Sequence, residues 1–117
     1  DPGPGTGVVE QKAPEVFTYV EQMPEPPYNI NEYLAKNIKY PPVAKENGIS
    51  GRVAINFVVN EDGSISGVKV VGNRTLGGGL EDEAMRVVRS LPAWKPGKQN
   101  GRAVKVYYTL PVNFRLE

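Results

Sequence analysis

The end of the chain alternates between apolar and polar side chains. Between Ala103 and Leu116 every second residue is apolar, starting at Val104, and the residues between them are mostly polar. Because successive side chains of a β-strand point to opposite faces, this pattern predicts one long strand with one buried and one exposed face. Pro111 lies within it and has no N–H to donate, so the strand belongs at a sheet edge or contains a bulge. A long edge strand can accept a strand from another chain, which makes partner binding the first functional hypothesis.

Size and composition limit the function classes open to the chain. Its 117 residues suit one domain with a single modest core, and its 39% hydrophobic and 23% charged residues are ordinary for a globular domain. A net charge of +1 is too small to indicate nucleic-acid binding. The chain has no cysteine and no histidine, which excludes thiolate chemistry and removes the commonest general base and metal ligand. We therefore expect that the protein is not an enzyme and that it binds no metal or cofactor. A serine–lysine pair brought together by the fold would still support a hydrolase.

The start of the chain differs in composition from the rest. Residues 1–15 are rich in proline and glycine, which predicts a flexible linker, and residues 16–117 form the predicted domain. No apolar run is long enough to span a bilayer, and no signal peptide is present. Because the chain starts at Asp1 rather than Met, we expect a fragment or a processed form.

Two helical segments are predicted from caps and apolar spacing. Asn29 and Glu32 have the spacing of a capping box, and the helix that follows ends near Lys39 because Tyr40 precedes a proline. Residues 42–47 allow one further turn. The second helix begins at Leu80, and its apolar stripe consists of Leu80, Ala84, Val87, Val88 and Leu91.

The remaining segments predict strands. Arg52–Val59 and Ile65–Val71 alternate around a turn at Asp62-Gly63, which indicates a hairpin. Val16–Val20 is a short β-prone run that either pairs with the sheet or only covers it. The predicted fold class is α+β, with a small antiparallel three-stranded sheet, an optional short N-terminal strand, and two helices packed on one face.

Several motifs recur in an order that resembles one known family. They are Tyr40-Pro41 with Ala44, Gly48-Ile49-x-Gly51-x-Val53, the hairpin around Asp62-Gly63, and Trp94-x-Pro96-Gly97 followed by Gly101. Together they resemble the C-terminal domain of the TonB energy transducers over residues 16–117. The segments Val20–Pro24 and Asn37–Pro41 look like the version found in Bacteroidetes-type bacteria.

The resemblance implies a function and a location. Such a protein is anchored in the inner membrane by a segment absent from this chain, associates there with the ExbB and ExbD motor proteins, and crosses the periplasm. Its C-terminal domain binds the TonB-box peptide of an outer-membrane transporter by β-strand addition. Proton motive force is thereby coupled to uptake of siderophores, vitamin B12 or glycans.

The resemblance and the edge-strand argument together give the candidate partner-binding residues. The motif residues Tyr40 and Pro41 have a second interpretation as a helix stop whose tyrosine packs on the sheet. The candidates are Tyr40, Pro41, Ala103, Val104, Lys105, Val106, Tyr107, Tyr108, Thr109, Asn113 and Arg115.

Two features decide how much of this edge a partner can use. If the nitrogen of Pro111 faces the partner, pairing is expected mainly along Ala103–Thr109. If Val16–Val20 already occupies the edge, the partner must displace it or bind elsewhere.

The basic residues Lys95, Lys98, Arg102 and Lys105 either attract acidic partner residues or form a solvated face. The alternative function is a TonB-like scaffold that forms a homodimer through the same edge or binds cell-wall glycan.

Overall fold

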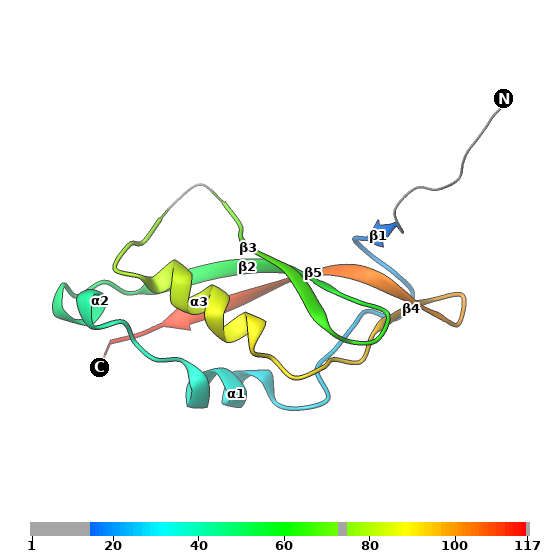
Figure 1. Ribbon diagram of the computed structural model, residues 1–117, viewed down its shortest axis with the longest axis horizontal. Coiled ribbons are helices and arrows are strands. Elements are labelled where there is room, and N and C mark those ends of the chain that lie inside the picture. Colours follow the sequence, from blue (N-terminus) through cyan, green and yellow to red (C-terminus); the bar gives the residue numbers. More distant parts are fainter. Residues whose placement is uncertain (1–14, 73–74, 117) are drawn as a thin grey trace, which may run out of the picture.

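The computed structural model describes residues 15–72 and 75–116, so the predicted linker lies almost entirely outside the described residues. Helices and strands follow one another in the order shown in Figure 1. The elements are β1 (Val16–Phe17), α1 (Ile30–Asn37), α2 (Pro42–Glu46), β2 (Gly51–Val59), β3 (Ile65–Val70), α3 (Leu80–Arg89), β4 (Gly97–Gln99) and β5 (Arg102–Phe114).

A single sheet organises the domain, with the strand order β1-β5-β2-β3. β2 pairs with β5 antiparallel from Gly51↔Phe114 to Val59↔Val106, and β2 and β3 form the predicted hairpin. β1 pairs with β5 in parallel, and β4 pairs with the start of β5 in antiparallel orientation. The α+β prediction is confirmed, and the sheet is mixed because the short N-terminal strand is parallel to its neighbour.

The helices begin and end where local chemistry requires. The side chain of Asn29 accepts a hydrogen bond from the backbone N–H of Glu32 at 3.0 Å, which caps α1. Ile38 is already extended, so α1 ends before the predicted Lys39. The predicted extra turn is α2, which begins at Pro42, since a proline at the first helical position loses no intrahelical hydrogen bond.

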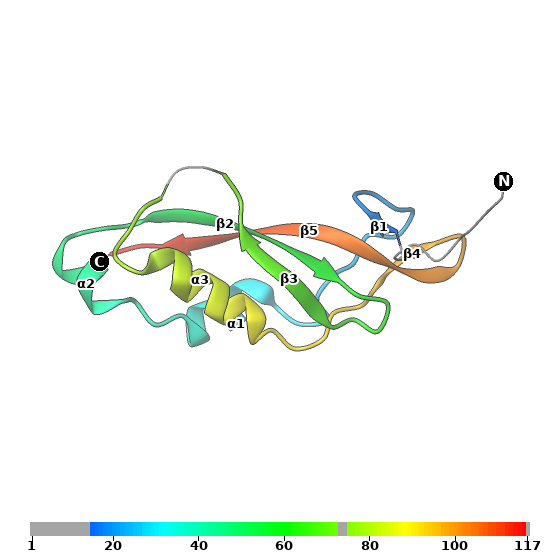
Figure 2. The same ribbon diagram turned by 45° about the horizontal axis from the view of Figure 1, so that its top comes forward.

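The core lies between the helices and one face of the sheet (Figure 2). All five residues of the predicted α3 stripe are buried, and β5 buries Val106, Leu110, Val112 and Phe114. Trp94 follows α3, and its ring meets those of Phe57 and Tyr108 at centroid distances of 5.5 and 4.9 Å. Leu116 was expected on the buried face but is 37% exposed, because β5 ends at Phe114.

Candidate partner-binding edge

The direction of the Pro111 nitrogen follows from the register of three strands. Pro111 lies opposite Ala54 of β2, and the carbonyl of Ala54 accepts a hydrogen bond from the N–H of Val71, on the β3 side, at 2.9 Å. In a strand the N–H and C=O of one residue point to the same side, so Ala54 makes no ladder bond to β5. The backbone nitrogen and carbonyl of Pro111 therefore point away from β2, toward the outer edge of the sheet.

The same alternation sets the direction of every backbone group along β5. Residues two positions apart in a strand present their N–H and C=O groups to the same side. The outward set therefore comprises Lys105, Tyr107, Thr109, Pro111 and Asn113. Because Pro111 has no N–H, its outward contribution is an acceptor only.

Part of the outer edge of β5 is already occupied. β1 pairs with β5 at Lys105 and Val106, on the side opposite β2. Among the described residues no strand pairs with β5 beyond Val106 on that outer side. The open edge is therefore Tyr107–Asn113, and of the stretch Ala103–Thr109 only the last three residues lie within it.

β4 covers the start of β5 from the inner side. Lys98 exchanges backbone hydrogen bonds with Gln22, at 3.1 and 2.8 Å, so its N–H and C=O point away from its β5 neighbour Ala103. The hydrogen-bonded pairs of this hairpin are then Gly97 with Val104 and Gln99 with Arg102. Val104 lies two residues before Val106, which pairs with β2, so the backbone groups of both residues point to the same side of β5. β4 therefore continues the line of β2.

The exposed face beside the open edge is polar with one aromatic residue. Tyr107 is 38% exposed, and Thr109 and Asn113 are exposed as well. The amide of Asn56 donates to Thr109 Oγ1 at 3.1 Å, which links β2 to β5 across this face. Tyr108 points to the opposite face and packs on Trp94, so its side chain is part of the core.

A groove borders the open edge near the end of β5, and the sequence did not indicate it. Its walls come from α1, from the first residues of β2 and from the end of β5. The residues that line it include Asn31, Ala35, Ile38, Pro111, Asn113 and Arg115. A strand added to β5 would therefore place the side chains that point toward the helices beside α1.

Tyr40 and Pro41 lie at the junction between α1 and α2. The Tyr40 hydroxyl donates to the carbonyl of Ile49, and its ring meets Phe114 edge-on at a centroid distance of 5.8 Å. Pro41 is the N-cap of α2. The two contacts of Tyr40 favour the interpretation that this motif packs on the sheet. They also place the motif beside the end of β5 rather than along the open edge.

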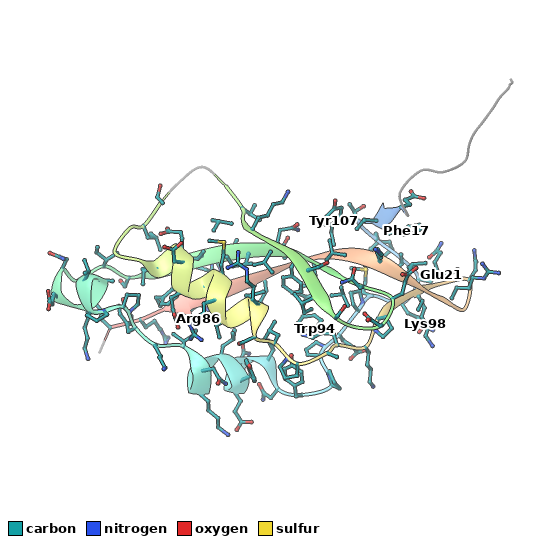
Figure 3. The ribbon with its side chains drawn as sticks, viewed as in Figure 1. Phe17, Glu21, Arg86, Trp94, Lys98 and Tyr107 are labelled. Carbon is teal, nitrogen blue, oxygen red and sulfur yellow. The ribbon has the colours of Figure 1, made fainter. Side chains whose placement is uncertain are left out.

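An ion pair on α3 holds this junction in place. The Glu83 carboxylate accepts from Arg86 Nη2 and from the backbone N–H of Lys39, each at 2.6 Å, and Arg86 also donates to the carbonyl of Asn37 at 2.9 Å. Figure 3 shows Arg86 on α3 beside the α1–α2 connection. The hydrogen bond from Arg86 and then that from Lys39 lower the pKa of Glu83 from its ordinary value.

Glu83→Gln is expected to destabilise the domain by about 1–2 kcal/mol at neutral pH, because it removes a charged hydrogen-bond acceptor. A carboxyl group with a lowered pKa in the folded state stabilises the fold above its unfolded-state pKa and loses this contribution as pH falls through the folded-state value. The difference between wild type and variant should therefore shrink as the pH drops below about 4.

Urea unfolding at neutral and acidic pH measures this difference, with Glu61→Gln, at an exposed turn position, as the control. A Glu83→Gln deficit that persisted unchanged at low pH would contradict the proposed role of the charge.

With the edge and its surroundings described, comparison with known proteins identifies the chain. A family model described as Gram-negative bacterial TonB protein C-terminal matches residues 36–116. The chain belongs to this family.

Individual relatives agree with the assignment. Two proteins named Protein TonB, from Helicobacter pylori strains J99 and 26695, are each 38% identical to this chain over 52 residues. The matches cover 38% of this chain and 19% and 18% of those proteins, so the chain spans about a fifth of their length.

Solved structures agree as well. The NMR structure of Helicobacter pylori TonB-CTD (residues 194-285) has a TM-score of 0.58 and 28% identity, covering 75% of this chain and 90% of that one. The longer NMR form (residues 179-285) gives 0.57 and 27%, covering 75% and 78%.

Family membership settles the class of protein. TonB proteins are energy transducers and not enzymes, as predicted for this chain. Within the described residues no helix has the length and apolar character needed to cross a membrane. The same residues contain no group of three or more acidic side chains arranged to hold a metal ion.

Proposed function

We propose that this TonB C-terminal domain binds the TonB-box peptide of an outer-membrane transporter by adding it as a strand to the outer edge of β5. The observation that carries the proposal is the row of outward backbone groups that begins at the carbonyl of Tyr107 and runs to Asn113, which no described strand satisfies. Thr109 and Asn113 offer both a donor and an acceptor there, and Tyr107 and Pro111 supply further carbonyls. Backbone pairing of this kind tolerates different partner sequences, which suits a domain that serves several transporters.

The groove beside α1 supplies the side-chain part of recognition in this proposal. An added strand turns every second side chain toward α1, where Ala35 and Ile38 offer a small apolar surface. Arg115 lies at the end of this groove and Arg52 lines it as well, so an acidic partner residue is favoured at that end. Of the candidates named from the sequence, Tyr107, Thr109, Asn113 and Arg115 are the ones we assign to direct contact.

The wider assignment follows from the family. We place the domain in the periplasm, as part of a protein anchored in the inner membrane and driven by ExbB and ExbD. The transported cargo, whether siderophore or glycan, and the Bacteroidetes-type lineage stay predictions from sequence motifs.

A titration of the isotopically labelled domain with a synthetic TonB-box peptide tests the proposal. Backbone amide shifts are expected to concentrate at Tyr107–Asn113 and on the groove side of α1. Shifts confined to α2 and α3, with β5 silent, would overturn the proposed edge while leaving partner binding intact. The concentration dependence of the mass, recorded in the same samples, tests the alternative in which β5 pairs with a second copy of the chain.

Pro111→Val is expected to tighten peptide binding roughly two- to tenfold, because it returns one outward N–H to the edge and a net hydrogen bond is worth about 0.5–1.5 kcal/mol. No ladder bond to β2 changes, since the nitrogen of Pro111 points outward. Isothermal titration of both proteins with one peptide measures the effect. Unchanged or weaker binding would argue against a bond from this position.

A further inference from the structure

The segment before α1 crosses from one side of the β4–β5 hairpin to the other. β1 lies on the outer side of β5, whereas Gln22 and Glu25 pair with Lys98 and Lys95 on the far side of β4. The connection between Phe17 and Gln22 therefore passes over the hairpin, as both ribbon views show (Figures 1 and 2). We call residues 16–25 the N-terminal strap.

The second half of the strap is firmly attached. Gln22 and Lys98 exchange two backbone hydrogen bonds, and Glu25 and Lys95 exchange two more, at 2.8–3.2 Å. The Glu21 carboxylate accepts from the N–H of Asn100 at 2.8 Å, and Figure 3 shows Glu21 close to the labelled Lys98. Val20 is 2% exposed, so it adds an apolar anchor to these polar contacts.

The first half of the strap is held more weakly. β1 has only two residues, Val16 and Phe17, and both are partly exposed. Tyr19, between β1 and the anchored half, is 78% exposed. A two-residue parallel pairing contributes few hydrogen bonds, so releasing β1 costs far less than releasing the half that follows it.

We propose that β1 is a releasable cover on the edge of β5, which a partner strand displaces to extend its own pairing from Tyr107–Asn113 to Lys105. The proposal rests on the strand addition described above and adds a competitor built into the chain. β1 and an extended partner strand need the same outward backbone groups of Lys105 and Tyr107, so the two cannot pair there together. Phe17 is the register partner of Val106, the residue before Tyr107, so β1 ends at the boundary between the covered and the open edge. Figure 3 labels both Phe17 and Tyr107.

The order of the two halves gives the cover a mechanical consequence. In an energy transducer, tension reaches this domain through the residues that precede Val16. β1 is then the first element to carry the load, and it is held more weakly than the half of the strap that follows it. Moderate tension removes β1 and lengthens the edge open to the partner, while the anchored residues 20–25 keep the load on β4. A pulled domain should therefore hold a long partner strand more tightly than a relaxed one.

A reversible disulfide between β1 and β5 tests the competition. Val16 and Lys105 are register partners, and neighbouring strands lie about 4.8 Å apart, within the Cα separation that a disulfide spans. Since the chain has no cysteine of its own, the double variant Val16→Cys with Lys105→Cys forms one defined bridge. The reduced form of the same molecule is the matched control.

Two synthetic TonB-box peptides are compared on both forms: a short one that spans only Thr109–Asn113 and one extended to reach Lys105. Oxidation is expected to weaken binding of the long peptide about fivefold or more, since two or three backbone hydrogen bonds are withheld. The short peptide should bind both forms alike. Phe17→Gly, which loosens β1 without a crosslink, should tighten the long peptide alone.

Each other outcome overturns a defined claim. Equal binding of the long peptide to oxidised and reduced forms would overturn the cover, while strand addition stands. Absence of binding by either peptide to either form and to the wild-type chain would overturn the proposed strand addition, and the cover with it.

Discussion

Alanine in place of Gly63 is expected to destabilise the domain by about 2–5 kcal/mol, a large part of the 5–15 kcal/mol that holds a typical domain folded. Gly63 has φ +87°, and a Cβ there would lie 2.2 Å from the carbonyl oxygen of Trp94. The carbonyl of Gly63 also accepts from the N–H of Trp94 at 2.9 Å, so the β2–β3 turn and the chain after α3 are in direct backbone contact. The added methyl group forces these two segments apart.

Gly101→Ala is the matched control, since Gly101 also lies in a hairpin turn, has φ +76°, and offers open space to a Cβ. It carries the backbone strain without the clash and should cost about 1–2 kcal/mol. Urea unfolding followed by the fluorescence of Trp94, the single tryptophan and 3% exposed, measures both variants. Equal losses would mean that the contact with Trp94 adds nothing beyond strain at a left-handed glycine.

Thr109→Pro is expected to weaken TonB-box binding about ten- to a hundredfold while the domain stays folded. The outward N–H of Thr109 is central to the open edge, and its loss leaves a partner carbonyl without a donor, at a cost of about 1–3 kcal/mol. The ladder between β5 and β2 keeps its bonds because Thr109 faces away from β2. Pro111 already shows that β5 accommodates a proline at an outward position.

Thr109→Ala separates the backbone donor from the side chain. It loses the hydroxyl that accepts from Asn56 but keeps the N–H, so binding should change less than about threefold. Isothermal titration of both variants with one peptide, after the unfolding midpoints have been checked, gives the comparison. Wild-type affinity in Thr109→Pro would exclude strand addition along this edge.

The alternation in β5 and the stripe of α3 were predictable because both depend on periodicity within one segment. Leu80, Ala84 and Val88 recur at helical spacing, and the burial of Val106, Leu110 and Val112 follows from a period of two. Pro111 indicated an edge position for the same local reason. These patterns determine which face of an element is buried, and they were sufficient for the fold class.

Features that depend on register between segments were not predictable. The outward direction of Pro111 becomes clear only once Ala54 is known to pair with Val71 on its other side. The β-prone run Val16–Val20 indicated the first half of the N-terminal strap. The contacts of Gln22 and Glu25 with Lys98 and Lys95 join two polar segments that show no alternation, so no local pattern indicated its second half. The groove beside α1 likewise needs the position of a helix relative to a strand edge.

The outward nitrogen of Pro111 also affects how copies of the chain treat one another. If two β5 edges met in a symmetric antiparallel pair, each copy would lack the N–H at its Pro111. This gap in the hydrogen-bond ladder would therefore occur twice in one contact. In the strand addition that we propose, a transporter peptide meets the gap only once. We therefore expect Pro111 to weaken self-association more than partner binding, and to guard an exposed edge against edge-to-edge aggregation without closing it to the partner.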